Sequence, residues 1–398
     1  MKYDFENTVD RSGLGSSKWL EMRKANPDLP AGIIPFSVAD MEIKNAPEIM
    51  EGLREYLDKD KLTLGYTTFT ESYNEAVRGW MKTRHGWDAD MRWNVLTPGV
   101  VSAFFNAVRA YTEPGEGVII FSPVYYPFNM AIEFQKRRIV DVPLVDSGMR
   151  YEIDWEQFEA AAGAPENKLL LFCSPHNPVG RVWLHDELMK VSEICLRNGV
   201  IVLSDEIHND LIMPGHKHTI FAALSEEAAQ NCVLCTAPSK TFSLAGLQTS
   251  NIFVPNEELR RKLLDEIHSF GLFSLNIIGY KACEIAYTKC ANWLEQAIAL
   301  ISDNAKFTEK FMAENIPQIK VYPLEGTYLQ WWDCRELFSD HLEMEDFMQK
   351  KAHLFFDEGY IFGDTGKGFE RINLACPKKV LSDALNRLCA ALKAAKRL

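Results

Sequence analysis

The sequence predicts an α/β protein with a largely parallel β-sheet, covered by helices on both faces, and a smaller α+β region after it. Short runs rich in Val, Ile and Leu alternate with helical stretches between residues 117 and 254. This alternation is typical of a parallel sheet with helices on both sides. After about Pro255 helical patterns predominate. The length of 398 residues exceeds what one compact core supports, so we expect a large and a smaller domain.

The elements follow one another in a regular order. The first forty residues are polar and are interrupted by glycine and proline. Helices are predicted over residues 46–56, from the loop at 64–68 to about 84, and over 97–111, 186–197 and 292–314. A closing helix is predicted from about 380. Strands are predicted over residues 117–121, 138–143, 168–173, 199–204, 231–236, 251–254, 319–322, 328–332 and 371–374. We expect residues 1–45 to form an N-terminal segment associated with the small domain, 46–288 the large domain and 289–398 the small C-terminal domain.

Composition limits the partners and the compartment. The chain has 43 basic and 55 acidic residues, a formal net charge of −12, which disfavours nucleic acid and anionic membranes as partners. No apolar run approaches the roughly 20 residues needed to span a bilayer. The first residues, Met1 to Asn7, lack the basic-then-apolar pattern of a signal peptide. We therefore expect a cytoplasmic protein without a nucleic-acid or membrane partner.

The nine cysteines have no framework spacing and predict reduced thiols. Cys232 and Cys235 have the C-x-x-C spacing, but no second such pair completes a four-ligand zinc site. Apolar residues lie between them, so we interpret the pair as part of a buried strand and expect no metal. The run His216-Lys217-His218 is predicted to be a solvated loop.

Lys240 is the first candidate for chemistry. It follows the apolar run Cys232-Val233-Leu234-Cys235, and small residues with Pro238 end the predicted strand just before it. Ligands of α/β proteins bind at strand ends, where the loops converge. A lysine in such a place can form a Schiff base with a carbonyl compound. The alternative is an ordinary surface lysine. The residues expected to lie near Lys240 distinguish the two interpretations.

Four further groups follow predicted strands or precede a helix. Asp205 lies in Ser204-Asp205-Glu206-Ile207-His208 and could pair with a protonated ring nitrogen, or could simply cap a helix. Asn177 lies between two prolines, suited to a fixed hydrogen bond or to a plain turn. Gly99 precedes a helix whose free N–H groups suit a phosphate. Tyr125 could stack on a planar ring or pack in the core. With Lys240 they meet the demands of pyridoxal phosphate.

The motifs resemble those of fold-type I pyridoxal phosphate enzymes, the aspartate aminotransferase superfamily, and within it the MalY/PatB family of cystathionine β-lyases. The resemblance covers nearly the whole chain in order. It rests on the following motifs: Val38-Ala39-Asp40-Met41, Gly65-Tyr66, Pro123-Val124-Tyr125-Tyr126-Pro127-Phe128, Ser204-Asp205-Glu206-Ile207-His208, Pro238-Ser239-Lys240-Thr241-Phe242, Ala245-Gly246-Leu247 and Arg371-Ile372-Asn373-Leu374-Ala375-Cys376-Pro377.

The resemblance implies a role for each site residue. Lys240 would be the Schiff-base lysine and general base, Asp205 would hold the pyridine nitrogen, and Arg371 would bind the substrate carboxylate. Tyr66 would reach the phosphate of the neighbouring subunit, which implies a homodimer with shared active sites. The remaining expected residues are Asn177, Tyr125, His208, Gly99, Val100, Val101 and Ser239 for the cofactor, Tyr126 for catalysis, and Asn177, Ala39 and Asp40 for the substrate.

Some positions depart from the family pattern. Ser37 and Ile43 stand where aromatic residues are usual, and Ser243 stands where asparagine is common. His208 occupies the place of a tyrosine in many superfamily aminotransferases, and Gln248 that of a phosphate-binding arginine. The last two favour the lyase branch, while the first three leave substrate preference open.

The resemblance therefore implies α,β-elimination from a sulfur amino acid, giving pyruvate, ammonia and a thiol. An aminotransferase on the same scaffold is the first alternative, because both reactions share every residue named. A protein that acts mainly by binding a regulator is the second, and a surface for such a partner leaves no motif.

Overall fold

A computed structural model describes residues 2–59, 62–68 and 70–398. Its described part contains a seven-stranded sheet in which five neighbouring strands run parallel and β9 runs antiparallel to both of its neighbours. The strands, in order across the sheet, are β1 (Asn94–Thr97), β9 (Ser250–Phe253), β8 (Cys232–Thr236), β7 (Ile201–Asp205), β6 (Asn167–Cys173), β2 (Gly117–Ile120) and β3 (Arg138–Asp141). The largely parallel sheet expected from the sequence is confirmed.

Helices cover both faces of this sheet because successive strand side chains point to opposite sides. Val118 and Ile120 belong to one buried cluster, and Ile119 between them belongs to the other. On the first face lie α4 (Val100–Tyr111), α5 (Pro127–Glu133) and α10 (Glu257–Ser269). On the second lie α6 (Trp155–Gly163), α7 (His185–Asn198) and α8 (Glu226–Gln230). Beside them, α3 (Glu71–His85) and α2 (Pro47–Leu57) pack on α11 (Ile277–Lys289).

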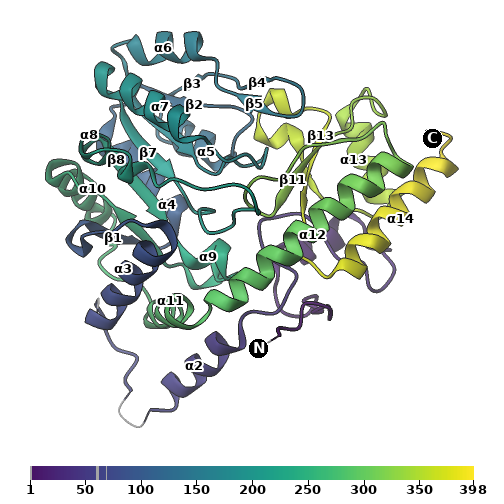
Figure 1. Ribbon diagram of the computed structural model, residues 1–398, viewed down its shortest axis with the longest axis horizontal. Helices are drawn as coiled ribbons and strands as arrows, with labels where there is room; N and C mark the ends of the chain where they lie inside the picture. The colour runs from purple at the N-terminus through teal and green to yellow at the C-terminus, as the bar shows by residue number, and fades with distance from the viewer. Residues whose placement is uncertain (1, 60–61, 69) are drawn as a thin grey trace.

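A second, antiparallel sheet lies to the right of the large one in Figure 1, with the helices of the C-terminal part around it. Its strand order is β10 (Lys320–Val321), β11 (Leu329–Asp333), β13 (Phe369–Asn373) and β12 (Asp357–Glu358). The helices are α12 (Ala291–Asn315), α13 (His341–Lys350) and α14 (Lys378–Ala394). A short hairpin of β4 (Val145–Asp146) and β5 (Tyr151–Glu152) lies apart from both sheets.

The N-terminal segment packs on the C-terminal part. Phe36 donates its backbone N–H to the carbonyl of Phe355 at 2.8 Å and accepts from the N–H of Asn373 at 3.0 Å. Trp19 and Met22 of α1 (Ser17–Ala25) share a buried cluster with Phe355. These contacts agree with an N-terminal segment associated with the small domain, while the exact division at residues 45 and 288 stays a prediction.

Most expected elements are present. The missed ones include the nine-residue helix α1, in the N-terminal segment for which no helix was expected, and two short strands. The sequence did not indicate the four-residue strand β1, which pairs with β9, or the two-residue strand β12. Strands this short carry too few residues for their hydrophobic pattern to be read. In the described residues, no helix is long and apolar enough to cross a membrane.

The prediction of a solvated loop at residues 216–218 is wrong for His218. His216 and Lys217 are exposed, but the His218 ring is buried and its Nε2 lies 2.7 Å from Oε2 of Glu206. Glu206 is itself fully buried after β7, so it needs a partner that polar loop composition does not reveal.

The interpretation of the C-x-x-C pair as buried strand is confirmed. Cys232 and Cys235 both lie in β8 and are completely buried, and their side chains enter opposite clusters. Opposite faces exclude a shared metal or disulfide. Among the described residues no group of His, Cys, Asp and Glu could hold a metal ion.

Thiol titration tests this burial. All nine cysteines are free and buried, and burial raises the pKa of the Cys232 and Cys235 thiols well above the usual value. We expect dithionitrobenzoate to react slowly with the thiols of the native chain. After unfolding in urea it should react with nine thiols per chain. Two rapidly reacting thiols in the native protein would instead indicate an accessible C-x-x-C pair.

Candidate active site

The carboxyl ends of three neighbouring strands build one edge of the site. Cys173, Asp205 and Cys235 stand in register at the ends of β6, β7 and β8. The loops after these strands converge there, as parallel strands require. They enclose a cavity of about 270 Å³. Among its lining residues are Ala39, Gly99, Val100, Val101, Tyr125, Tyr126, Asn177, Asp205, His208, Ser239, Lys240 and Arg371, all singled out from the sequence.

Lys240 enters the cavity from α9 (Pro238–Thr241), a single turn that begins two residues after β8. Pro238 fits the first helical position, where its missing N–H is not needed. The Lys240 Nζ donates to the carbonyl of Ala39 at 2.9 Å. Burial and the nearby Arg371 lower the pKa of Lys240 to about 8, against the opposing effect of three aspartates. The neutral, nucleophilic form of the amine is therefore populated near physiological pH far more than in an ordinary lysine.

Asp205 and His208 form the floor of the cavity and are both almost completely buried. Burial raises the pKa of Asp205 to about 7. In the described part of the chain its carboxylate accepts one hydrogen bond, from the backbone N–H of Ile207 at 3.2 Å. Burial lowers the pKa of His208 well below its usual value, so the ring is neutral. Its Nδ1 has no partner among the described residues. The carboxylate is thus placed to accept a proton-bearing ligand atom.

Arg371 lies in β13 on the opposite wall, and two side chains hold its guanidinium. Nη1 donates to Oδ1 of Asn177 at 2.7 Å, and Nη2 pairs with Oδ2 of Asp357. The guanidinium carbon lies 4.6 Å from the ring centre of Phe362. Nε is buried without a partner in the described structure. A guanidinium fixed in this way suits bidentate binding of a carboxylate.

The start of α4 forms the third wall. Gly99, with φ of 91°, turns the chain into the helix, a conformation that side chains other than glycine rarely adopt. Val100 and Val101 follow in the first turn, whose backbone N–H groups have no partner within the helix. Tyr125 lines the cavity half-buried, and Tyr126 beside it is more exposed at the mouth. This wall can bind an anion at one end and a flat ring beside Tyr125.

Two expected residues lie elsewhere. Tyr66 is fully exposed in the segment between α2 and α3 and does not line the cavity of its own chain. Asp40 lies on the far side of the Ala39 loop, lines a second cavity and pairs with Arg11 at 2.6 Å. It is therefore not placed to contact a ligand beside Lys240.

Sequence reasoning missed Asp357, which lines the cavity and binds both Arg371 and the backbone N–H of Val38, the latter at 2.8 Å. The available signal was a charged residue directly after the buried run Leu354-Phe355-Phe356. Asp357 is in a two-residue strand, so no strand pattern pointed to it.

Comparisons with known proteins agree with this geometry. The family model Aminotransferase class I and II matches residues 31–388. The chain belongs to this family. Within this aminotransferase family it is 39% identical to cystathionine β-lyase PatB of Bacillus subtilis, over 98% of this chain and 100% of PatB. It is 31% identical to protein MalY of Escherichia coli, over 98% of this chain and 99% of MalY.

Solved structures match the chain over nearly its whole length. Cystalysin from Treponema denticola, which contains a pyridoxal 5′-phosphate cofactor, superposes with a TM-score of 0.97 and is 50% identical, covering 99% of this chain and 100% of cystalysin. The pyridoxal-phosphate-bound C–S lyase from Staphylococcus hominis gives a TM-score of 0.89 at 29% identity, covering 98% of each chain. The resemblance to the PatB and MalY group is confirmed.

The pKa of Lys240 is directly measurable. In the cofactor-free chain, acetic anhydride should acetylate Lys240 with a midpoint near pH 8, whereas ordinary lysines titrate at about 10.4. Asp357→Asn should lower the midpoint further, because that carboxylate favours the charged amine. Site-resolved mass spectrometry across pH provides the measurement, with exposed lysines of the same chain as reference. A Lys240 midpoint equal to theirs would contradict the buried electrostatics.

Proposed function

We propose that this protein is a pyridoxal-phosphate-dependent C–S β-lyase that cleaves sulfur amino acids by α,β-elimination to pyruvate, ammonia and a thiol. The observation that carries the proposal is the placement of Lys240, Asp205 and Arg371 around one cavity. The cystathionine β-lyases and C–S lyases among the similar proteins favour elimination over aminotransfer.

The cavity fits the cofactor. The first turn of α4 offers N–H groups to a phosphate, and the half-buried Tyr125 offers a ring face. Asp205 would hold the pyridine nitrogen, and the nearby His208 leaves Nδ1 without a partner in the described structure. Lys240 is the one lysine among the lining residues and would bind the aldehyde carbon. When bound, pyridoxal phosphate supplies an electron sink for the carbanion that forms at the substrate Cα.

The side chains divide the work on the substrate. Arg371 and Asn177 bind the α-carboxylate, and the bond between them at 2.7 Å keeps both in place. Lys240, once its amine is free, removes the α-proton as general base. The Cβ–S bond then breaks, the sulfur leaves with the electron pair, and water converts the remaining unsaturated amino acid to pyruvate and ammonia.

Tyr126 serves as the proton donor to the leaving sulfur. It stands at the mouth of the cavity, where a departing thiolate would pass. Burial, together with the neighbouring Asp357, raises the pKa of its phenol, so the hydroxyl keeps its proton at neutral pH. Ser239 and Ala39 complete the walls beside Lys240.

The active unit is a cytoplasmic homodimer with shared sites. Tyr66 is fully exposed in its own chain and lies outside that chain's cavity. The family resemblance assigns this tyrosine to the phosphate of the neighbouring subunit, which accounts for an aromatic side chain left in solvent. Nine free thiols suit a reducing compartment.

Product analysis tests the reaction type. Incubation with cystathionine should release pyruvate without any keto-acid acceptor, because elimination needs none. Lys240→Ala should lower kcat for pyruvate release by at least about a thousandfold. It should also abolish the visible absorbance that the lysine-bound cofactor gives. Turnover that depends on a keto acid would assign the protein to the aminotransferases, and a Lys240→Ala variant with full activity would refute the role of this lysine.

Subunit mixing tests the shared site. Lys240→Ala and Tyr66→Ala homodimers should each be impaired, but equal mixing with subunit exchange should restore about a quarter of wild-type activity. The reason is that half of the dimers are mixed, and each of those has one intact site. Activity that stays at the average of the two parents would contradict a phosphate contact across the dimer.

A further inference from the structure

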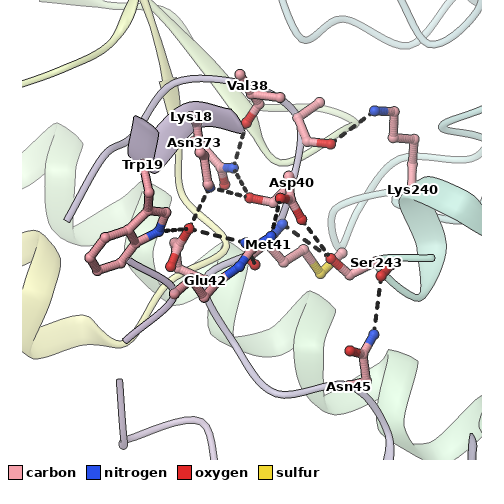
Figure 2. A network of polar contacts seen from close by, with 12 residues as sticks. Lys18, Trp19, Val38, Asp40, Met41, Glu42, Asn45, Lys240, Ser243 and Asn373 are labelled. Carbon is pink, nitrogen blue, oxygen red and sulfur yellow. Dashed lines mark hydrogen bonds and ion pairs between the residues drawn. The ribbon is translucent and has the colours of Figure 1, made fainter. Parts of the chain in front are cut away.

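The motif at residues 38–41 contacts the motif at residues 371–377 beside Lys240. Asn373, in the second motif, has no role assigned above. Asn373 ends β13, two residues after Arg371, and is almost completely buried. Its Nδ2 donates to the carbonyl of Val38 at 2.9 Å and to the carbonyl of Asp40 at 2.8 Å. Figure 2 shows this amide between the two carbonyls. Asn373 thus uses both of its N–H bonds to hold the residues on either side of Ala39.

The backbone between those carbonyls is a tight turn. The N–H of Asp40 donates to the carbonyl of Val38 at 2.9 Å, which closes a three-residue turn around Ala39. Val38 has φ of 58°, a conformation that costs a β-branched residue free energy. Asn373 binds the carbonyls on both sides of Ala39. The carbonyl of Ala39 itself accepts a hydrogen bond from the Lys240 Nζ at 2.9 Å.

Lys18 holds the same turn from α1. Its side chain is fully buried, donates to the carbonyl of Asp40 at 2.5 Å and pairs with Glu42 at 2.7 Å. The indole of Trp19 donates to the same Glu42 oxygen at 3.1 Å. The carbonyl of Asp40 therefore accepts from two buried donors, so the turn cannot rotate without breaking both.

We propose that Asn373 and Lys18 are positioning residues that orient the carbonyl of Ala39 toward Lys240. This carbonyl then accepts a hydrogen bond from the amine whenever the lysine is not bound to the cofactor. The proposal rests on the proposed function, in which the free amine removes the α-proton. A lysine side chain has several rotatable bonds, and Arg371 nearby disfavours its charged form. A fixed acceptor keeps the amine within reach of the proton that it must take.

The test uses Asn373→Ala in the full-length enzyme. We expect kcat for cystathionine to fall roughly 10- to 100-fold with a smaller change in KM, because a misplaced base slows the chemical step. The isotope effect on kcat with α-deuterated substrate should rise, because proton removal becomes limiting. The absorbance of the bound cofactor should persist. Asn373→Asp, whose carboxylate can still accept from the N–H of Ala375, should behave in the same way if Asn373→Ala folds poorly.

Asn304 supplies a matched control. It is buried in α12, and its Nδ2 donates to the carbonyls of Leu374 and Cys376, each at 2.9 Å. Asn304→Ala removes the same kind of double hydrogen bond without touching the Ala39 turn. We expect it to lower the melting temperature about as much as Asn373→Ala but to leave the isotope effect unchanged.

A second measurement does not need turnover. A carbonyl that accepts from the Lys240 ammonium stabilises the charged form, so its loss lowers the pKa. The acetylation midpoint of Lys240 in the cofactor-free chain should therefore fall in Asn373→Ala and stay at the wild-type value in Asn304→Ala. The charged groups that act on Lys240, which are Arg371, Asp40, Asp205 and Asp357, are the same in both variants.

The outcomes separate the two proposals. Equal effects of Asn373→Ala and Asn304→Ala on the isotope effect and the midpoint would overturn the positioning role and leave only a structural one. If the wild-type enzyme released no pyruvate from any sulfur amino acid, the proposed function would fail. The acetylation midpoint would still decide whether Asn373 positions the acceptor of Lys240.

Discussion

Two basic side chains, Lys240 and Arg371, share one largely buried cavity, and the rest of the site depends on how their charges are balanced. Arg371 and burial act together to lower the pKa of the lysine. Asp40, Asp205 and Asp357, from three different segments of the chain, oppose them. The balance leaves an amine with a pKa of about 8 beside a guanidinium, which is what a general base next to a carboxylate-binding group requires.

The fold supplies this balance by bringing distant segments together. Asp205 ends β7 and Lys240 follows the adjacent parallel strand β8, so their proximity follows from sheet order. Arg371 and Asp357 come from the antiparallel sheet of the C-terminal part, where they are cross-strand partners. The turn around Ala39 comes from the N-terminal segment and contacts both Asn373 of β13 and Lys240 after β8. Asp357 joins the last two by binding Arg371 and the N–H of Val38.

The sequence predicted the parts of this arrangement that follow from regular structure. Residues at or just after the carboxyl ends of neighbouring apolar strands, such as Asp205 and Lys240, meet at one edge of the sheet. Asp357, Asn373 and the Glu206–His218 pair could not be predicted in this way. Their roles depend on which side chain faces which carbonyl or carboxylate across the fold, and single-sequence periodicity carries no such information. The family resemblance named Arg371 but did not indicate that Asp357 binds its guanidinium.

The Lys18–Glu42 pair shows why these contacts serve orientation more than stability. Removing two charges from water costs about as much as their attraction returns, and apolar side chains of similar volume are often equally stable. Such a replacement would fill the space under α1, yet it would remove the donor to the carbonyl of Asp40. That carbonyl would then be held by Asn373 alone. The orientation of the Ala39 carbonyl, and therefore the position of the Lys240 amine, would then depend on Asn373 without Lys18.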